Sequence, residues 1–119
     1  DNNKVKVHEV HCAVDCGLVI NPGIARAQIS SAIIYGLSAA LKSKITINDG
    51  KVVEANFDDF DVIRMDETPE INVYLVDSEA SPKGVGEPGL PPIAPAIANA
   101  VYAATGKRYR NLPINLDVT

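Results

Sequence analysis

The longest periodic stretch of the chain runs from Pro22 to Lys42 and predicts its largest helix. Asn21 stands just before it, and an asparagine side chain can cap the free N–H groups of a first turn, where proline is also tolerated. Apolar residues recur along one face at helical spacing, namely Ile24, Ile29, Ile33, Leu37 and Leu41. A second, small row lies beside them, formed by Gln28, Ala32, Gly36 and Ala40. We therefore expect a buried helix whose backbone another group can approach closely.

Two strands and a hairpin are predicted around this helix. Residues 4–14 alternate apolar and polar side chains, with a change of phase near His8, and residues 71–77 form a second strand-like run. The pair Asp49-Gly50 is the commonest two-residue signal for a type I′ turn, so residues 44–57 are expected to form a hairpin.

A second helix, rich in alanine, is predicted over residues 94–105. Gly106 is placed to end it in a left-handed conformation, and three cations follow where a helix C-terminus favours them: Lys107, Arg108 and Arg110. The acidic residues between 58 and 70 are interpreted as a solvated face. With no repeat and no linker, residues 1–119 are predicted to be one α+β domain with a mixed or antiparallel sheet and two main helices.

Composition narrows the classes of partner. Hydrophobic residues make up 46% and charged residues 22%, which is typical of a globular domain. The net charge of -4 offers no positive patch, so nucleic acid is not an expected partner. No apolar run approaches the roughly 20 residues that cross a bilayer, so no membrane span is expected. Two cysteines four residues apart do not define a compartment, and the localisation stays open.

Four side chains near the start of the chain resemble a zinc cluster: His8, His11, Cys12 and Cys16. On a strand, His8 and Cys12 would lie about 13 Å apart, and His11 would point to the opposite face. Ligands of one zinc ion must converge at about 2 Å. We therefore predict no metal ligand in this chain and interpret these residues as core and edge-strand positions.

The segment from Gly84 to Gly89 matches the glycine pattern of dinucleotide-binding loops and stands between a strand and a helix. We reject that interpretation because the strand ends well before Gly84, whereas the fingerprint turn is tight. Prolines also remove N–H groups from the helix start that would hold a pyrophosphate: Pro88, Pro91 and Pro92.

Glu87 is unusual on local grounds, because it is the one charged residue from Gly84 to Ile93. The glycines around it let the backbone come close to a ligand, and Pro88 stiffens the turn. A carboxylate held in an apolar, rigid loop is disposed to act as a base, since desolvation favours its protonated form. A loop glutamate that simply points into water is the alternative, and the spacing alone leaves both open.

Several sequence blocks together carry a family resemblance. The string GVGEPGLPPIAPAIANAVYAATGKR, preceded in order by AVDCGLVINPGIARAQI, YGLSAAL and the NF of EANF and followed by RNLP, covers nearly all of residues 7–113. It resembles the C-terminal part of the molybdopterin-binding subunit in the xanthine dehydrogenase family of molybdenum hydroxylases, of the isoquinoline 1-oxidoreductase and aldehyde oxidoreductase type. Four residues match the family's strand-to-helix turn, to which we assign a structural role: Asp15, Gly17, Asn21 and Pro22.

The resemblance implies site residues and a cofactor. Glu87 corresponds to the active-site glutamate, which serves the family as general base. Gln28 matches the glutamine that hydrogen-bonds the molybdopterin, and Gly84, Val85 and Gly86 match the loop that runs past the molybdenum. The implied cofactor of the full-length enzyme is molybdenum-molybdopterin, in which the pterin dithiolene holds the metal, so that no protein metal ligand is required.

The resemblance also implies an activity and partners. We expect hydroxylation of N-heterocycles or oxidation of aldehydes, with water as the source of oxygen and a small molecule as substrate. The expected partners are the rest of the molybdenum subunit and an iron–sulfur subunit that takes up the electrons. The start of the chain, without Met, suggests an excised fragment that by itself binds no cofactor, is inactive and self-associates as a homo-oligomer. A non-catalytic structural or interaction domain that kept the fold is the alternative.

Overall fold

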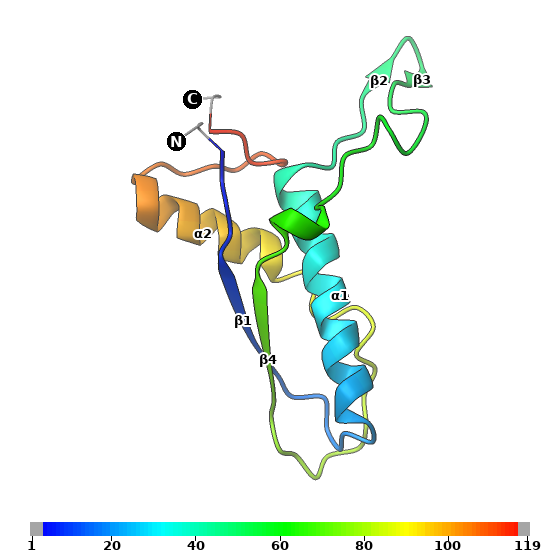
Figure 1. Ribbon diagram of the computed structural model, residues 1–119, viewed down its shortest axis with the longest axis vertical. Helices are drawn as coiled ribbons and strands as arrows, with labels where there is room; N and C mark the ends of the chain where they lie inside the picture. Colours follow the sequence, from blue (N-terminus) through cyan, green and yellow to red (C-terminus); the bar gives the residue numbers. More distant parts are fainter. Residues whose placement is uncertain (1–3, 117–119) are drawn as a thin grey trace.

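A computed structural model describes residues 4–116 of the chain. Its elements in order are β1 (Glu9–Val14), α1 (Pro22–Leu41), β2 (Ile47–Asn48), β3 (Lys51–Val52), the short 3₁₀ helix η1 (Met65–Glu67), β4 (Glu70–Leu75) and α2 (Ile93–Thr105). Figure 1 shows α1 alongside the β1–β4 pair, with α2 running across them at one end and the two described termini close together. The predicted α+β class with two main helices is confirmed.

The helix α1 forms where the sequence predicts it. Asn21 Oδ1 accepts a hydrogen bond from the backbone N–H of Ile24 at 3.0 Å, and Pro22 takes the first helical position. The helix ends at Leu41, one residue earlier than predicted. Ile24 departs from the predicted apolar face, because it is 61% exposed. The buried face therefore begins at Ala25 and continues with Ile29.

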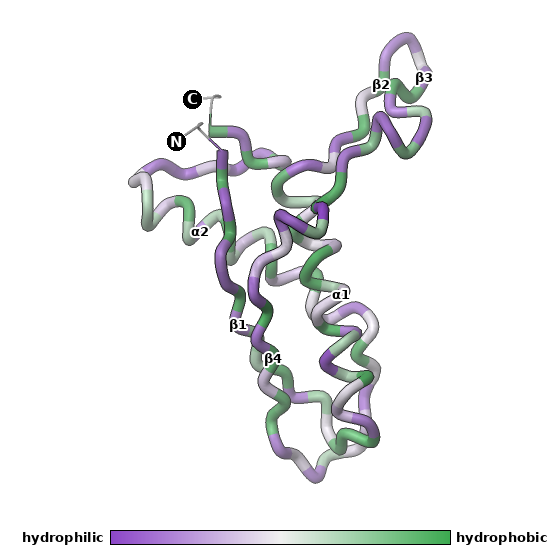
Figure 2. The backbone as a smooth tube through the Cα atoms, in the orientation of Figure 1, coloured by the Kyte–Doolittle hydropathy of each residue, from purple (hydrophilic) through white to green (hydrophobic). Residues whose placement is uncertain are grey.

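The strands β1 and β4 pair in parallel, with Glu9 opposite Glu70 and Val14 opposite Leu75. The expected strand over residues 4–14 is too long, since the regular ladder begins only at Glu9. The change of phase explains the difference, because His8 and Glu9 are both exposed and the alternation restarts there. The alternation of hydrophobic and hydrophilic residues along both strands is visible in Figure 2.

The strands β2 and β3 form a separate antiparallel pair, so the parallel and antiparallel pairings of this fold belong to two sheets. Asp49 and Gly50 have φ angles of 47° and 74°, both left-handed, as a type I′ turn requires. The hairpin is shorter than the predicted 44–57, and it projects away from the helices (Figure 1).

The core lies where α1 meets α2 and the inner face of the parallel sheet. Its buried members are Ile29, Ile33, Leu37, Ala40, Ile93, Ile97, Val101 and Ile114. By length and composition α1 is apolar enough to cross a membrane, so the expectation that no segment reaches this level is wrong. In this fold, however, α1 supplies the most deeply buried side chains of the core. The central helix of a globular domain can be as long and as apolar as a membrane-spanning helix.

The acidic segment between 58 and 70 does more than face solvent. Lys42 Nζ lies 2.6 Å from Glu67 Oε2 and 3.4 Å from Asp61 Oδ2. Burial lowers the pKa of Lys42, but the hydrogen bonds and charges of Glu67 and Asp61 outweigh burial and raise it overall. The hydrogen bond from Lys42, with one from the backbone N–H of Arg64, lowers the pKa of Glu67. The segment is thus fastened to the C-terminal end of α1.

Candidate functional site

The loop over residues 78–92 connects β4 to α2 and runs along α1 (yellow in Figure 1). Two backbone hydrogen bonds join its first half to the turn that precedes α1. The N–H of Leu18 donates to the carbonyl of Ala80 at 2.8 Å, and the N–H of Lys83 donates to the carbonyl of Cys16 at 2.9 Å. These two hydrogen bonds hold Ala80 and Lys83 against the turn, and the rest of the loop continues from there.

Gly17 makes this junction possible. Its φ of +70° is left-handed, and a Cβ at this position would overlap the carbonyl oxygen of Ser81 and lie 2.7 Å from the carbonyl oxygen of Ala80. The side chain of Asp15 accepts a hydrogen bond from the N–H of Gly17 at 3.1 Å. The structural role expected for this turn is therefore to support the loop that carries Glu87.

The second half of the loop is pressed against α1. A Cβ on Gly89 would lie 3.0 Å from the carbonyl oxygen of Ile29 and 3.1 Å from the Cβ of Ala32. The small row of α1 was expected to admit a close neighbour, and that neighbour is the chain's own loop. The same holds one turn later, where a Cβ on Gly36 would lie 2.9 Å from the Cβ of Ile93.

Glu87 opens a tight turn in this loop. The N–H of Leu90 donates to the carbonyl of Glu87 at 2.9 Å, with Pro88 and Gly89 at the centre of the turn. The side chain of Glu87 is exposed and makes no hydrogen bond or ion pair within residues 4–116. This part of the chain therefore does not supply the desolvation expected for Glu87, because Pro88 and the neighbouring glycines do not cover its side chain.

The other residues assigned to the cofactor lie close by. Gly84 and Gly86 are exposed, and a Cβ on either would meet nothing within 4 Å, whereas Val85 is half-buried against the core. Gln28 is exposed on α1 and directly precedes Ile29, which Gly89 touches. Gln28 stands four residues before Ala32, the other residue that Gly89 contacts, so Gln28 and this part of the loop share a face of α1. No side-chain contact joins Gln28 to Glu87 in the described part of the chain.

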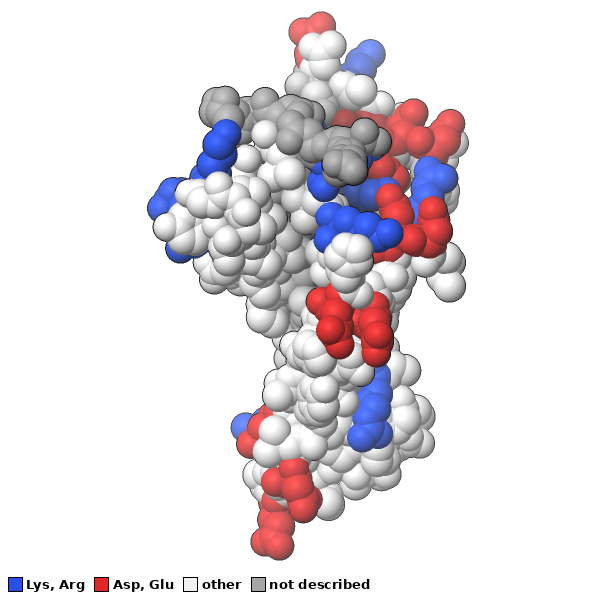
Figure 3. Space-filling model, turned by 60° about the vertical axis from the view of Figure 1, so that its left-hand side comes forward, with Lys and Arg blue, Asp and Glu red and all other residues white. Residues whose placement is uncertain are grey.

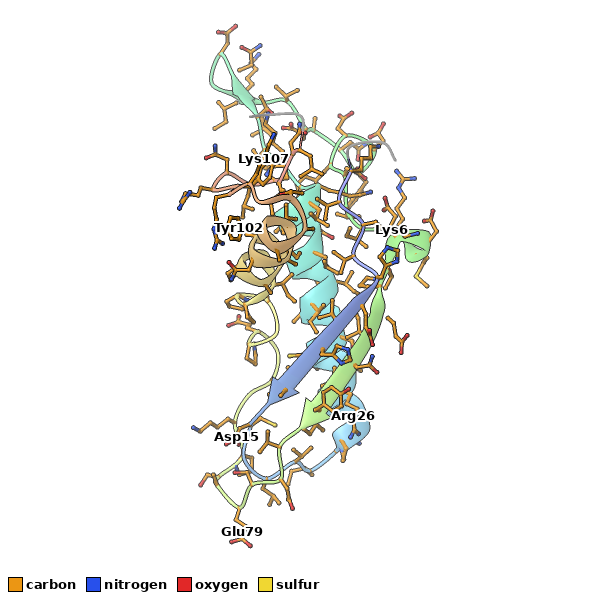
Figure 4. The ribbon with its side chains drawn as sticks, turned by 90° about the vertical axis from the view of Figure 1, so that its left-hand side faces the viewer. Lys6, Asp15, Arg26, Glu79, Tyr102 and Lys107 are labelled. Atoms are coloured by element: carbon orange, nitrogen blue, oxygen red, sulfur yellow. The ribbon has the colours of Figure 1, made fainter. Side chains whose placement is uncertain are left out.

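Charges are sparse around this side of the molecule. Figure 4 shows Asp15 and Glu79 near the end where β1 and β4 finish, and Arg26 on the first turns of α1. The one cation in the sequence of the loop is Lys83. The polar groups that this chain offers to a ligand here include the main-chain N–H groups of the loop, the amide of Gln28 and the carboxylate of Glu87.

No protein metal site is visible among the described residues, where no three His, Cys, Asp or Glu side chains come together. His8 and His11 are exposed, Cys12 is half-buried, and Cys16 is buried. Burial raises the pKa of the Cys12 thiol, which disfavours the thiolate that a metal would bind. An amide, free backbone N–H groups, two open glycines and one carboxylate fit a cofactor that brings its own metal ligands.

Comparison with known proteins identifies relatives over the whole described fold. The sequence profile of the molybdopterin cofactor-binding domain matches residues 1–69. Isoquinoline 1-oxidoreductase subunit beta of Brevundimonas diminuta is 42% identical over 94% of this chain and 14% of that protein. The membrane-bound aldehyde dehydrogenase (pyrroloquinoline-quinone) of Gluconacetobacter polyoxogenes is 38% identical over 85% of this chain and 13% of that protein.

A solved structure shares the fold. Quinoline 2-oxidoreductase from Pseudomonas putida 86 superimposes with a TM-score of 0.85 over 94% of this chain and 15% of that chain, at 23% identity. At that level of identity the likeness concerns the fold alone. The chain accordingly spans about one seventh of the length of the proteins that it matches.

Proposed function

Because this chain belongs to the family of molybdopterin cofactor-binding domains, we propose that it forms one wall of the cofactor site in the molybdenum subunit of a hydroxylase. The resemblance inferred from the sequence blocks is confirmed by the profile match and by the relatives. The proposed reaction is hydroxylation of an N-heterocycle or oxidation of an aldehyde, with oxygen from water. One observation supports the proposal, namely that Gly89, two residues after Glu87, packs on α1 against Ile29 and Ala32, which follow Gln28 within one helical turn.

Glu87 is the proposed general base. When bound, the molybdenum cofactor supplies the two-electron oxidation of the substrate. The carboxylate of Glu87 takes up the proton that must leave the attacking oxygen, a contribution of about 10² to 10⁴ in rate. Its side chain has no other partner in the described part of the chain, so no ion pair has to break before the proton is transferred.

Gln28 and the loop from Gly84 to Gly86 are the proposed cofactor contacts. The amide of Gln28 can both donate and accept, which suits a pterin edge carrying both kinds of group. The space beside Gly84 and Gly86 allows a ligand to reach the main-chain N–H groups of the loop. A side chain at either glycine would stand between the backbone and the cofactor.

The remaining walls of the site are proposed to come from other parts of the protein. Glu87 is exposed here, so the rest of the subunit must cover it and remove water before the base becomes effective. An iron–sulfur subunit is the proposed acceptor of the electrons. The chain by itself is therefore proposed to be inactive.

The test is to purify the full-length subunit with its partner subunits, measure molybdenum and pterin, and assay N-heterocycles and aldehydes with a dye as electron acceptor. We expect about one molybdenum per subunit and turnover of at least one substrate class. A fully loaded complex that oxidises neither class would contradict the proposed reaction. A complex that contains a quinone and no molybdenum would contradict the proposed cofactor. A complex with no redox cofactor at all would also contradict it and would favour the non-catalytic alternative.

A further inference from the structure

The strand β1 has one edge that is unpaired within residues 4–116. The carbonyl of His8 accepts a hydrogen bond from the N–H of Glu70 at 3.0 Å. The carbonyl of Val14 accepts one from Val76 at 2.9 Å. Main-chain groups of successive strand residues point to alternate sides, so every second residue of β1 turns its N–H and C=O away from β4. Those residues are Glu9, His11 and Ala13.

A groove lies along the segment that leads into β1 and along the first half of β1, and α2 forms its other side. Its volume is about 610 Å³, and it lies between residues 4–11 and one face of α2. The α2 side carries three exposed alanines one turn apart, which are Ala96, Ala100 and Ala104. In Figure 1, α2 extends past the free edge of β1, and Figure 3 shows an uncharged surface here with Lys and Arg side chains on either side.

The open edge of β1 and the exposed alanines of α2 indicate what kind of segment would lie beside them. Parallel sheets are normally covered on both faces, and a two-stranded sheet has too few partners to be stable by itself. Unpaired main-chain groups on an edge are satisfied by the addition of another strand. A strand laid beside β1 would also lie over the exposed alanines of α2, whose small side chains permit a close approach.

We propose that a β-strand from another part of the same subunit pairs with the free edge of β1 and fills the groove above α2. This rests on the proposed function in one respect, that the chain works within a longer subunit, and the relatives are about seven times its length. The incoming strand is expected to alternate, with apolar side chains toward α2. Exposed Lys4 and Lys6 border the groove and favour an acidic residue near one end of that strand.

Hydrogen exchange in the full-length subunit, resolved to single residues, tests the proposal directly. The amides of His11 and Ala13 should be protected by at least about 10²-fold relative to an unstructured chain, because they would donate to the added strand. The amides of Cys12 and Val14 face β4 and are the internal reference. Fast exchange at His11 and Ala13, with protection retained at Cys12 and Val14, would overturn the proposal.

A pair of variants in α2 gives a second measurement. Ala100→Lys places a long cation in the groove and should lower the thermal midpoint of the full-length subunit by several degrees. Ala103→Lys is the matched control, because Ala103 is exposed on the same helix but does not line the groove. Equal midpoints for the two variants would contradict a strand lying over Ala100.

Dilution separates this occupant from a second copy of the chain. Protection at His11 and Ala13 should stay unchanged when the subunit is diluted until light scattering shows a monomer. Loss of protection on dilution would assign the edge to a second copy and overturn the proposal. Neither measurement depends on turnover, so a subunit that lacks molybdenum would contradict the proposed function while leaving this result unaffected.

Discussion

Replacing Gly17 by alanine tests how the fold supports the loop that carries Glu87. Two separate costs are expected. The first is conformational, because an L-residue in the left-handed region, with Gly17 at φ +70°, costs about 1–2 kcal/mol. The second is steric, because the new Cβ would overlap the carbonyl oxygen of Ser81 and lie 2.7 Å from that of Ala80, so that both carbonyls must move.

The steric part can be sized from what holds Ala80 in place. Moving its carbonyl strains the hydrogen bond from Leu18 and the neighbouring bond from Lys83 to Cys16. Each such bond contributes about 0.5–1.5 kcal/mol to stability. The total expected for Gly17→Ala is therefore a loss of about 2–5 kcal/mol in the free energy of unfolding.

Two other glycines of the chain separate these costs. Gly50 has a φ of +74° with nothing within 4 Å of a Cβ, so Gly50→Ala should show the conformational cost of about 1–2 kcal/mol by itself. Gly84 has neither feature, so Gly84→Ala should stay within about 0.5 kcal/mol. The assay is urea unfolding of the 119-residue chain, with turnover of the full-length enzyme carrying Gly17→Ala as a functional measure. A cost for Gly17→Ala no larger than for Gly50→Ala would refute the tight junction between the turn and the loop.

Three further predictions concern the site and the fold. Gln28→Ala in the full-length subunit should lower pterin content more than thermal stability, because Gln28 is exposed and is not part of the hydrophobic core; unchanged pterin content would contradict the proposed contact. The 119-residue chain expressed alone should bind no molybdenum, and bound molybdenum in metal analysis would contradict this expectation. It should also form dimers or larger assemblies through exposed apolar residues such as Phe57, which is 96% exposed. A monomer by light scattering at high concentration would contradict this self-association. The pKa of Glu67 is lowered by its bond to Lys42, so its contribution to stability is present above the ordinary carboxyl value of 4.5 and is lost as pH falls below it. Glu67→Gln should therefore flatten the loss of stability in acid, and an unchanged pH profile would show that the pair contributes little.

Much of the fold follows from local sequence signals. The Asn21-Pro22 start of α1, the type I′ turn at Asp49-Gly50 and the left-handed Gly106 after α2 were all predicted, and each is where expected. These features depend on one or two residues and their immediate neighbours. For the same reason they do not depend on how distant segments meet.

Contacts between distant segments were less predictable. The pairing of Lys42 with Asp61 and Glu67 was missed, because a run of acidic residues gives no sign of which acid meets a half-buried cation. The small row of α1 correctly indicated a close neighbour, but only the fold shows that Gly89 and Ile93 fill it. A glycine-rich loop and a small helix face of the same chain are complementary signals that could have been combined.

The site residues were assigned through the family resemblance, and the spacing around Glu87 left its role open. The fold adds that Gln28 and the Glu87 loop share one side of α1. It does not bury Glu87, because the groups that would desolvate it are not in this part of the chain.

The most direct test of the account is Glu87→Gln in the full-length enzyme, measured together with molybdenum and pterin content. Glu79→Gln is the matched control, since Glu79 is an exposed glutamate in the same connection between β4 and α2. The account predicts that Glu87→Gln keeps its cofactor but loses turnover by about 10² or more, because an amide cannot take up the proton. Glu79→Gln should retain wild-type turnover. Turnover of fully loaded Glu87→Gln within a few-fold of the wild type would contradict the role of Glu87 as the base.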